Sequence, residues 1–233
     1  EFIASIGDSE YNCKELIINN YKNVLELPLL IDFERTNTPN FNQEIINKYL
    51  NTFNILFVGR IVLNKCQHQL INVISYLKRN YQNRDFKLII VGEASQPEYQ
   101  NYIKSYAKKL DLEKDVIFTG KVSNDDLATY YKVSNLYLSL SVHEGFGMPL
   151  IEALKYDIPV LAYNAGGISS TVIKDSLMEN KSTSYISKRI IQIVDDSLLR
   201  AKIVLQQQNL LNNPYLKKQY LLHLHILHVE QLL

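Results

Sequence analysis

Short apolar runs alternate along the chain with segments whose apolar residues recur at helical spacing. The runs are NILFVGR (54–60), FKLIIVGE (86–93), DVIFTGK (115–121), NLYLSLS (135–141) and IPVLAYN (158–164). The helical segments between them begin near residues 65, 98, 123 and 148. Continuous apolar strands separated by amphipathic helices are typical of a parallel sheet covered on both faces. The pattern predicts a doubly wound, Rossmann-like α/β domain over roughly residues 51–180.

The flanking segments have other patterns. Residues 1–35 are expected to form a strand, a helix and a strand, too little for a domain and resembling the end of one. A polar linker over 36–52 then leads into the α/β domain, which we place at 53–197. Residues 198–233 are predicted to be helical. Within the domain, Ser123 is predicted to cap the helix that follows it.

Glycines mark the predicted carboxyl ends of the strands. They are Gly59, Gly92, Gly120, Gly145 and Gly147. Any one of them can be explained as the end of a strand in a tight turn. Together they favour a ligand site, because open α/β sheets bind ligands at this edge and glycine allows close backbone approach.

Composition narrows the class of partner. The formal net charge is +1, so no global field attracts nucleic acid and any anion must be held by local groups. Cys13 and Cys66 form no C-x-x-C pattern and are expected to be free thiols in a reducing compartment. The sequence has no apolar run of membrane-spanning length and no basic leader. We expect a cytoplasmic protein whose chain begins inside a longer gene product.

Two segments carry candidate anion-binding chemistry. Arg60 and Lys65 in "VGRIVLNK" flank the start of a helix, where cations and free amides can bind an anion. The alternative is a pair of solvated side chains in a loop. Neither a Walker phosphate loop nor a G-x-G-x-x-G dinucleotide turn is present.

The second segment is "HEGFGMPLIEAL". Pro149 suits the first turn of a helix, which would leave the amides of residues 146–148 free to bind an anion. Glu152 can be explained by the helix dipole alone, but that explanation does not cover Glu144. Two acids beside an anion-binding turn suit a ligand that carries both hydroxyl groups and phosphates.

These residues resemble the donor-binding half of a retaining, family-four (group 1 type) glycosyltransferase of the GT-B fold. The resemblance rests on "DSEYNCKELI", "NVLELPLLIDFER", "ILFVGRIVLNK", "LIIVGE", "VIFTGKVSNDDLATYYKVSNLYLSLSVHEGFGMPLIEAL", "IPVLAYNAGG" and "IIQIVDDSLLRAKI". It combines an E-x7-E pair with an upstream G-R-x-x-x-x-K, and it extends to about residue 210.

The resemblance implies roles for individual residues. Arg60 and Lys65 would hold the diphosphate and Glu144 the donor sugar, and these three are the implied catalytic residues. Glu152 would bind the ribose. The implied donor-binding residues are Gly59, Thr119, Gly120, Lys121, Val122, Gly145, Phe146, Gly147, Met148, Leu150 and Glu152. The donor would be a UDP-, GDP- or ADP-sugar, and transfer would proceed with retention, without a metal or other cofactor.

The resemblance also implies partners and exposes departures. A glycan or lipid-linked acceptor would bind mainly to a preceding domain, so the protein could lie at the inner face of the membrane.

Ser169 and Ser170 replace the Pro and Glu common in the family after the fifth strand. His143 is expected to support the site rather than react. The "HLHILH" segment lacks a full metal-ligand set, and this helix is expected to pack back towards the N-terminal domain, or to mediate self-association when exposed.

Two other functions stay open from the sequence. The chain could be a partner-dependent or non-catalytic nucleotide-sugar-binding subunit, as the departure at "GGISSTV" suggests. It could also be a sugar-nucleotide epimerase or phosphorylase, an alternative that rests on fold analogy alone.

Overall fold

The computed structural model describes residues 4–27 and 39–212. Its centre is a six-stranded sheet of order β5-β4-β3-β6-β7-β8, in which all neighbours are parallel. The strands are β3 (Phe53–Val58), β4 (Phe86–Val91), β5 (Val116–Gly120), β6 (Leu136–Ser139), β7 (Val160–Tyr163) and β8 (Leu177–Met178). Counted from β3, this is the 3-2-1-4-5-6 order of a Rossmann sheet. The predicted doubly wound sheet is confirmed.

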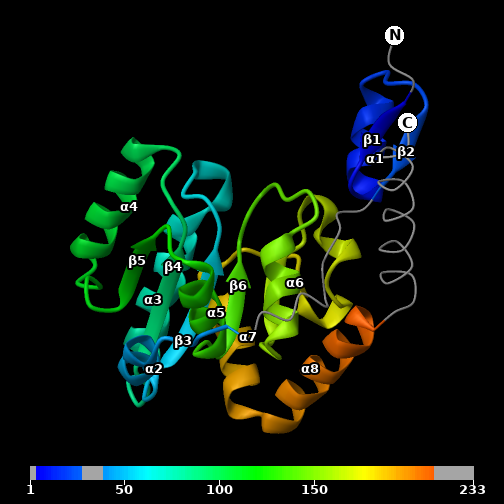
Figure 1. Ribbon diagram of the computed structural model, residues 1–233. Helices are drawn as coiled ribbons and strands as arrows, with labels where there is room; N and C mark the ends of the chain where they lie inside the picture. The colour runs from blue at the N-terminus through cyan, green and yellow to red at the C-terminus, as the bar shows by residue number, and fades with distance from the viewer. Residues whose placement is uncertain (1–3, 28–38, 213–233) are drawn as a thin grey trace.

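Helices cover both faces of this sheet (Figure 1). On β3, Ile55 and Phe57 join one hydrophobic core and Leu56 joins the other, because successive strand residues point to opposite faces. The first core is completed by α3 (Gln67–Asn80), α4 (Pro97–Lys109) and α7 (Thr183–Asp195). The second is completed by α2 (Gln43–Tyr49), α5 (Asn124–Lys132) and α6 (Met148–Lys155).

A small N-terminal unit contains β1 (Ser5–Gly7), α1 (Glu10–Ile18) and β2 (Val24–Glu26). The two strands are parallel, as expected from the predicted strand, helix and strand. In Figure 1 this unit lies at the upper right, beyond α6. Helix α1 contacts the 3-10 helix η2 (Gly166–Ser170), so the unit touches the loops that follow the main strands.

The predicted polar linker contains a short helix, α2, that the sequence analysis did not predict. Asn42 caps it by accepting hydrogen bonds from the amides of Glu44 and Ile45. The Asn42 side chain also donates to Asp126 on α5, over 2.9 Å. The ring of Tyr49 is buried in the core of the main domain. These contacts anchor the segment before β3 to α5, although its composition is that of a linker.

Two predicted helix starts are confirmed. Ser123 caps α5, since its hydroxyl oxygen accepts a hydrogen bond from the amide of Asp126 at 3.1 Å. Pro149 is the second residue of α6. Proline lacks an N–H group, but at this position an N–H would have no acceptor within the helix, so no hydrogen bond is lost.

The chain forms two 3-10 helices after β7, first η2 and then η3 (Lys174–Ser176). It then enters β8, a two-residue strand that was not predicted from the sequence. The last described helix, α8 (Ser197–Leu211), packs on α6 and α7. Its buried Gln207 donates to the carbonyl of Ile158 and accepts from the amide of Val160. The "HLHILH" segment lies outside the described residues, and so does the helix predicted to pack back towards the N-terminal domain. In the described part, no helix combines the length and apolar character needed to cross a membrane.

Candidate functional site

The candidate site lies at the carboxyl edge of the sheet, above β3 and β6. These strands are neighbours, and the chain winds outwards from them in opposite directions. Loops diverge at such a point and leave a crevice in which α/β proteins bind ligands. Gly59 and Arg60 follow β3, and the loop containing Glu144 follows β6. The sheet order therefore brings together the two segments that the sequence singled out.

Lys65 and Glu144 form an ion pair across this point. Lys65 ends the 3-10 helix η1 (Leu63–Lys65), and its Nζ lies 2.7 Å from Oε2 of Glu144. Their side chains are only 16% and 14% exposed. The Lys65 ammonium also donates to the carbonyl of His143, over 3.4 Å. Both residues were predicted for the site, but their pairing was not. An anionic ligand at Lys65 would compete with the Glu144 carboxylate.

The N-terminus of α6 adds free amides beside this pair. Gly147 precedes the helix with a φ of 76°, and its carbonyl accepts from the amide of Leu150 at 2.9 Å. In the described part of the chain, the amides of residues 146–148 have no hydrogen-bond acceptor. Because the N-terminal end of a helix carries partial positive charge, these amides can bind an anion.

A second turn supports the Glu144 loop from behind. The amide of Gly167, after β7, donates to the carbonyl of Glu144 at 2.9 Å. A Cβ atom on Gly167 would lie 1.9 Å from the carbonyl oxygen of Gly145, so only glycine fits without movement. This role was not predicted, although the Gly-Gly pair in "YNAGG" is typical of a close backbone approach.

Glu152 is held by a tyrosine instead of a cation. The hydroxyl of Tyr131 on α5 donates to Oε2 of Glu152, over 2.7 Å. Glu152 is the fifth residue of α6, which lies beyond the first turn. The helix dipole falls off within that turn, so the simple explanation considered for this acid does not apply.

Arg60 lies beside an open pocket of about 600 Å³. The pocket is lined by Arg60, Val62, Leu63, Asn64, Cys66, His68, Gln96 and Val142. Buried Gln67 donates to the backbone carbonyl of Arg60 at 2.9 Å and so fixes the turn after β3. No carboxylate of residues 4–27 or 39–212 pairs with the guanidinium, which leaves this cation available to a ligand.

Some predicted donor-binding residues offer little to a ligand. Leu150 is 1% exposed and its amide is already used, so it supports the helix start from the core. The side chain of Phe146 is buried against Ile151, which leaves only its backbone. The Thr119 hydroxyl donates to the carbonyl of Gly120, at 2.9 Å.

Three predicted donor-binding residues lie at or just after the end of the edge strand, β5: Gly120, Lys121 and Val122. Two strand spacings, about 10 Å, separate β5 from β3. The site therefore has lateral extent along the sheet edge, from the end of β5 to the Glu144 loop. An extended ligand, unlike a small anion, could contact both ends.

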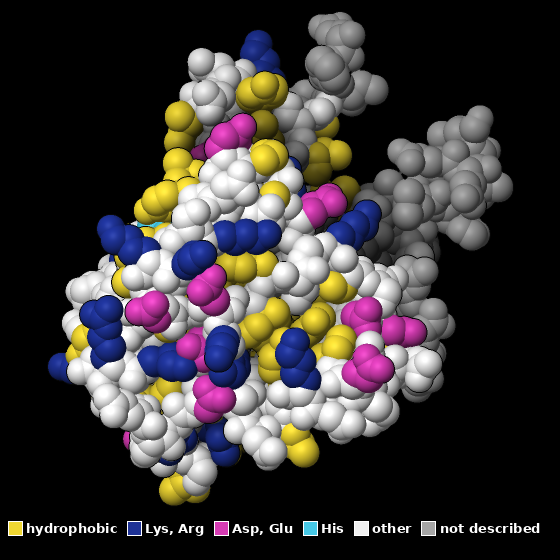
Figure 2. Space-filling model, turned by 90° about the vertical axis from the view of Figure 1, so that its left-hand side faces the viewer, with side chains coloured by type: hydrophobic (Ala, Val, Ile, Leu, Met, Phe, Trp, Pro, Cys, Tyr) yellow, Lys and Arg dark blue, Asp and Glu magenta, His cyan; other side chains and the backbone are white. Residues whose placement is uncertain are grey.

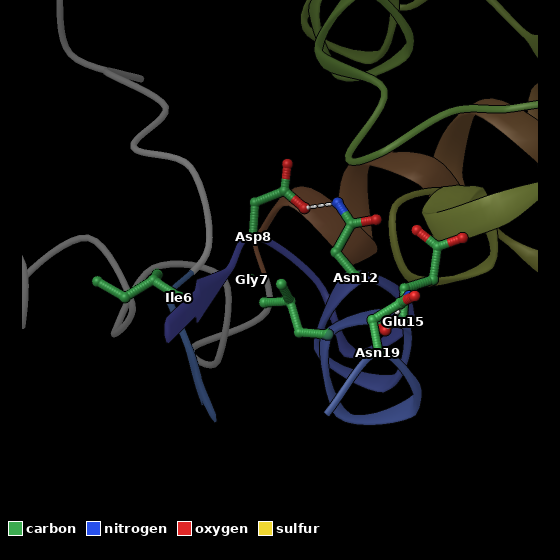
Figure 3. Close-up of a pocket in the computed structure, with 7 residues that line it drawn as sticks. Ile6, Gly7, Asp8, Asn12, Glu15 and Asn19 are labelled. Carbon is green, nitrogen blue, oxygen red and sulfur yellow. Dashed lines mark hydrogen bonds between the residues drawn. The ribbon is translucent and has the colours of Figure 1, made fainter. Parts of the chain in front are cut away.

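The N-terminal unit approaches the other side of the Glu144 loop. A Cβ atom on Gly145 would lie 3.2 Å from the side-chain nitrogen Nδ2 of Asn12 and 3.3 Å from a carboxylate oxygen of Asp8. The ring of Tyr11 meets His143 edge-on, with 6.3 Å between centroids. Asp8 and Asn12 also line a pocket of about 410 Å³ with Ile6, Gly7, Glu15, Leu16 and Asn19 (Figure 3). These polar side chains were not among the predicted site residues.

The wider surface shows no concentrated charge on the face drawn in Figure 2, where acidic and basic side chains are interspersed. Within residues 4–27 and 39–212, no group of three or more potential ligands is arranged to hold a metal ion. Metal-independent transfer stays a prediction.

The fold and site together define a Rossmann-like domain with a candidate anion-binding site at its switch point. The sequence model of the family "Glycosyl transferases group 1" matches residues 40–209. The chain belongs to this family.

Known proteins agree with this assignment. The capsular polysaccharide biosynthesis glycosyltransferase CapM of Staphylococcus aureus is 30% identical over 179 residues, which cover 74% of this chain and 45% of CapM. This chain thus spans less than half of that relative. The C-terminal domain of the group 1 glycosyltransferase LpcC from Francisella tularensis is 25% identical, with a TM-score of 0.64, and covers 76% of this chain and 94% of that domain. Anabaena HepE, solved with UDP, shares the fold at 20% identity, with a TM-score of 0.80 over 96% of this chain and 63% of HepE. These GT-B structures confirm the predicted fold class.

Proposed function

We propose that this chain is the donor-binding part of a glycosyltransferase that takes a sugar from a nucleoside diphosphate sugar and transfers it with retention. The observation that carries the proposal is the Lys65–Glu144 ion pair at the switch point, 2.7 Å apart. A single ligand could reach both a cation, which suits a phosphate, and a carboxylate, which suits sugar hydroxyls, and this supports the proposal. The free amides of residues 146–148, at the start of α6, add further hydrogen-bond donors in the loop that contains Glu144.

In this proposal, each group acts on a different part of the donor. Arg60, Lys65 and the amides of residues 146–148 bind the diphosphate. As the bond between the sugar and the β-phosphate breaks, negative charge grows on the leaving diphosphate, and fixed cations stabilise it. Glu144 accepts hydrogen bonds from the sugar, and Glu152 accepts from the ribose. The segment 119–122 contacts the base.

The identity of donor and acceptor is also a proposal. HepE has been crystallised with UDP and with UDP-glucose, which supports a uridine diphosphate sugar as the first donor to test. CapM acts in capsular polysaccharide biosynthesis by its name, which supports a glycan or lipid-linked acceptor here. We propose no metal in the transfer step.

The proposal is tested by thermal unfolding in the presence of UDP-, GDP- and ADP-sugars. We expect at least one of them to raise the melting temperature of the wild-type chain, because a ligand that binds only the folded state stabilises it. Lys65→Ala and Glu152→Ala should each abolish most of that rise. A melting curve that no donor changes would contradict the proposal.

A further inference from the structure

Three tyrosine rings form a stacked column beside the candidate site. Tyr131 of α5 lies between Tyr156 at the end of α6 and Tyr137 of β6. The centroid of its ring is 5.3 Å from that of Tyr156, with an interplanar angle of 8°, and 6.5 Å from that of Tyr137, at 18°. Tyr131 is 2% exposed and Tyr137 is 1% exposed. The packing thus fixes the orientation of the Tyr131 ring.

The hydroxyl of Tyr131 has one proton and two possible acceptors. Oε2 of Glu152 lies at 2.7 Å and the carbonyl of Pro149 at 3.2 Å. The shorter, ionised acceptor forms the stronger hydrogen bond. Burial, followed by the charges of Tyr137 and Glu152, raises the pKa of Tyr131 well above its ordinary value. Tyr131 therefore keeps its proton and acts as a permanent donor to Glu152.

This contact uses only one of the two carboxylate oxygens of Glu152. No described cation pairs with its carboxylate, and no described donor lies within hydrogen-bonding distance of Oε1. Its position beyond the first turn of α6 removes the helix dipole as a reason for the acid. A carboxylate with one oxygen fixed and the other open is arranged to accept hydrogen bonds from a ligand.

The column also connects Glu152 to the turn that follows β3. The hydroxyl of Tyr137 donates to the carbonyl of Val58 at 3.2 Å and accepts from its amide at 3.4 Å. Val58 directly precedes Gly59 and Arg60. The stacked rings therefore set the separation between the end of β3 and Glu152, the two points at which a nucleotide's phosphates and ribose would be held.

We propose that Tyr131 is a positioning residue for ribose recognition. Its hydroxyl holds Oε2 of Glu152 so that Oε1 accepts from the ribose hydroxyls of the nucleotide, and Tyr137 and Tyr156 hold its ring. This inference rests on the proposed function, because it requires a ribonucleotide in the site.

The test compares UDP with 2′,3′-dideoxy-UDP in calorimetric titrations of the full chain, or the matching GDP or ADP pair if one of those bases binds better. The wild type should prefer the ribonucleotide. Tyr131→Phe, which keeps the ring and removes the hydroxyl, should weaken ribonucleotide binding roughly tenfold, as expected for loss of one hydrogen bond to a charged group. It should leave the affinity for the dideoxy analogue unchanged. Tyr130→Phe, on the neighbouring residue, is the matched control and should change neither affinity.

The outcomes separate the inference from the function on which it rests. If the wild type binds no nucleoside diphosphate, the proposed function fails, and the inference fails with it. If the wild type prefers the ribonucleotide and Tyr131→Phe keeps that preference, the inference alone is overturned. If Tyr131→Phe does not fold, Glu152→Asp withdraws the carboxylate from the hydroxyl by one methylene. The same selective loss is then expected, and an unchanged preference would refute the role of Tyr131.

Discussion

At the scale of single residues, the site depends on an ion pair that a ligand must share. Lys65 and Glu144 neutralise each other in the structure, with little solvent around either side chain. A diphosphate that binds to Lys65 has to compete with the carboxylate. Under the proposed function, Glu144 would thus lower the affinity for the diphosphate while it adds affinity for the sugar, and these two effects can be measured separately.

Glu144→Gln should show both effects. The amide no longer neutralises Lys65, so the affinity for free nucleoside diphosphate should stay the same or rise by severalfold. The additional affinity that the sugar gives to the nucleoside diphosphate sugar should fall about fivefold, as for one weakened hydrogen bond. Titration with both ligands gives the two numbers. A variant that binds the free diphosphate tenfold more weakly would show that Glu144 does not compete for Lys65.

The sequence singled out four candidate residues of the site, but it did not predict their contacts. Arg60, Lys65, Glu144 and Glu152 were recognised from local spacing and from the family resemblance. The pairing of Lys65 with Glu144, and of Tyr131 with Glu152, depends on which strands become neighbours and on side-chain packing. The residues of each pair are far apart in the sequence, so a local pattern along the chain could not predict either contact.

At the scale of elements, the position of the Glu144 loop depends on the turn after β7. The Gly167 amide holds the Glu144 carbonyl, and the backbones touch at Gly145. Glycine is required here by contact between two backbones, which cannot move aside as a side-chain end can.

Gly167→Ala should therefore disturb both stability and binding. The added methyl group would lie 1.9 Å from the Gly145 carbonyl oxygen. The backbone has to shift to avoid this clash, which should lower the free energy of unfolding by roughly 1–3 kcal/mol. It should also weaken nucleotide binding, because the Glu144 loop has to move. Urea unfolding and titration measure the two effects. Ser169→Ala, at an exposed position on the same turn, should stay within about 0.5 kcal/mol of the wild type; an equal loss there would refute the steric explanation.

The element boundaries show where periodicity is informative. The five long apolar strands and their helices were predicted, because most residues of β3, β4, β6 and β7 are buried and the edge strand β5 keeps the same apolar pattern. Strand β8 was missed because two residues carry no periodicity. Helix α2 was missed because its seven residues are mostly polar, and its stability comes from tertiary contacts such as Asn42 to Asp126.

At the scale of the whole molecule, the N-terminal unit and the main domain contribute unequally to the candidate site. The pair β1 and β2 is a two-stranded sheet, which is marginal alone. Lys65, Glu144, Tyr131 and Glu152 all come from the main domain. The LpcC structure is that of a C-terminal domain, and it matches this chain over 76% of its length.

A chain that begins at Pro39 should accordingly fold and keep the affinity for nucleoside diphosphate within about threefold, since none of the groups proposed to bind the phosphates or the ribose is removed. Circular dichroism and titration test this. A loss of tenfold or more in a folded chain would mean that Asp8, Asn12 or their neighbours take part in nucleotide binding.

The central claim is that Lys65 binds the diphosphate of a nucleotide in the crevice above β3 and β6. Calorimetric titration with UDP, GDP and ADP and with the corresponding monophosphates tests it most directly. For the base that binds, the wild type should prefer the diphosphate. Lys65→Ala should reduce diphosphate affinity roughly ten- to a hundredfold, as for one charge-assisted hydrogen bond, and remove most of that preference. Lys108→Ala, an exposed lysine on α4, should keep it. No diphosphate binding by the wild type, or equal preference in Lys65→Ala, would contradict the account.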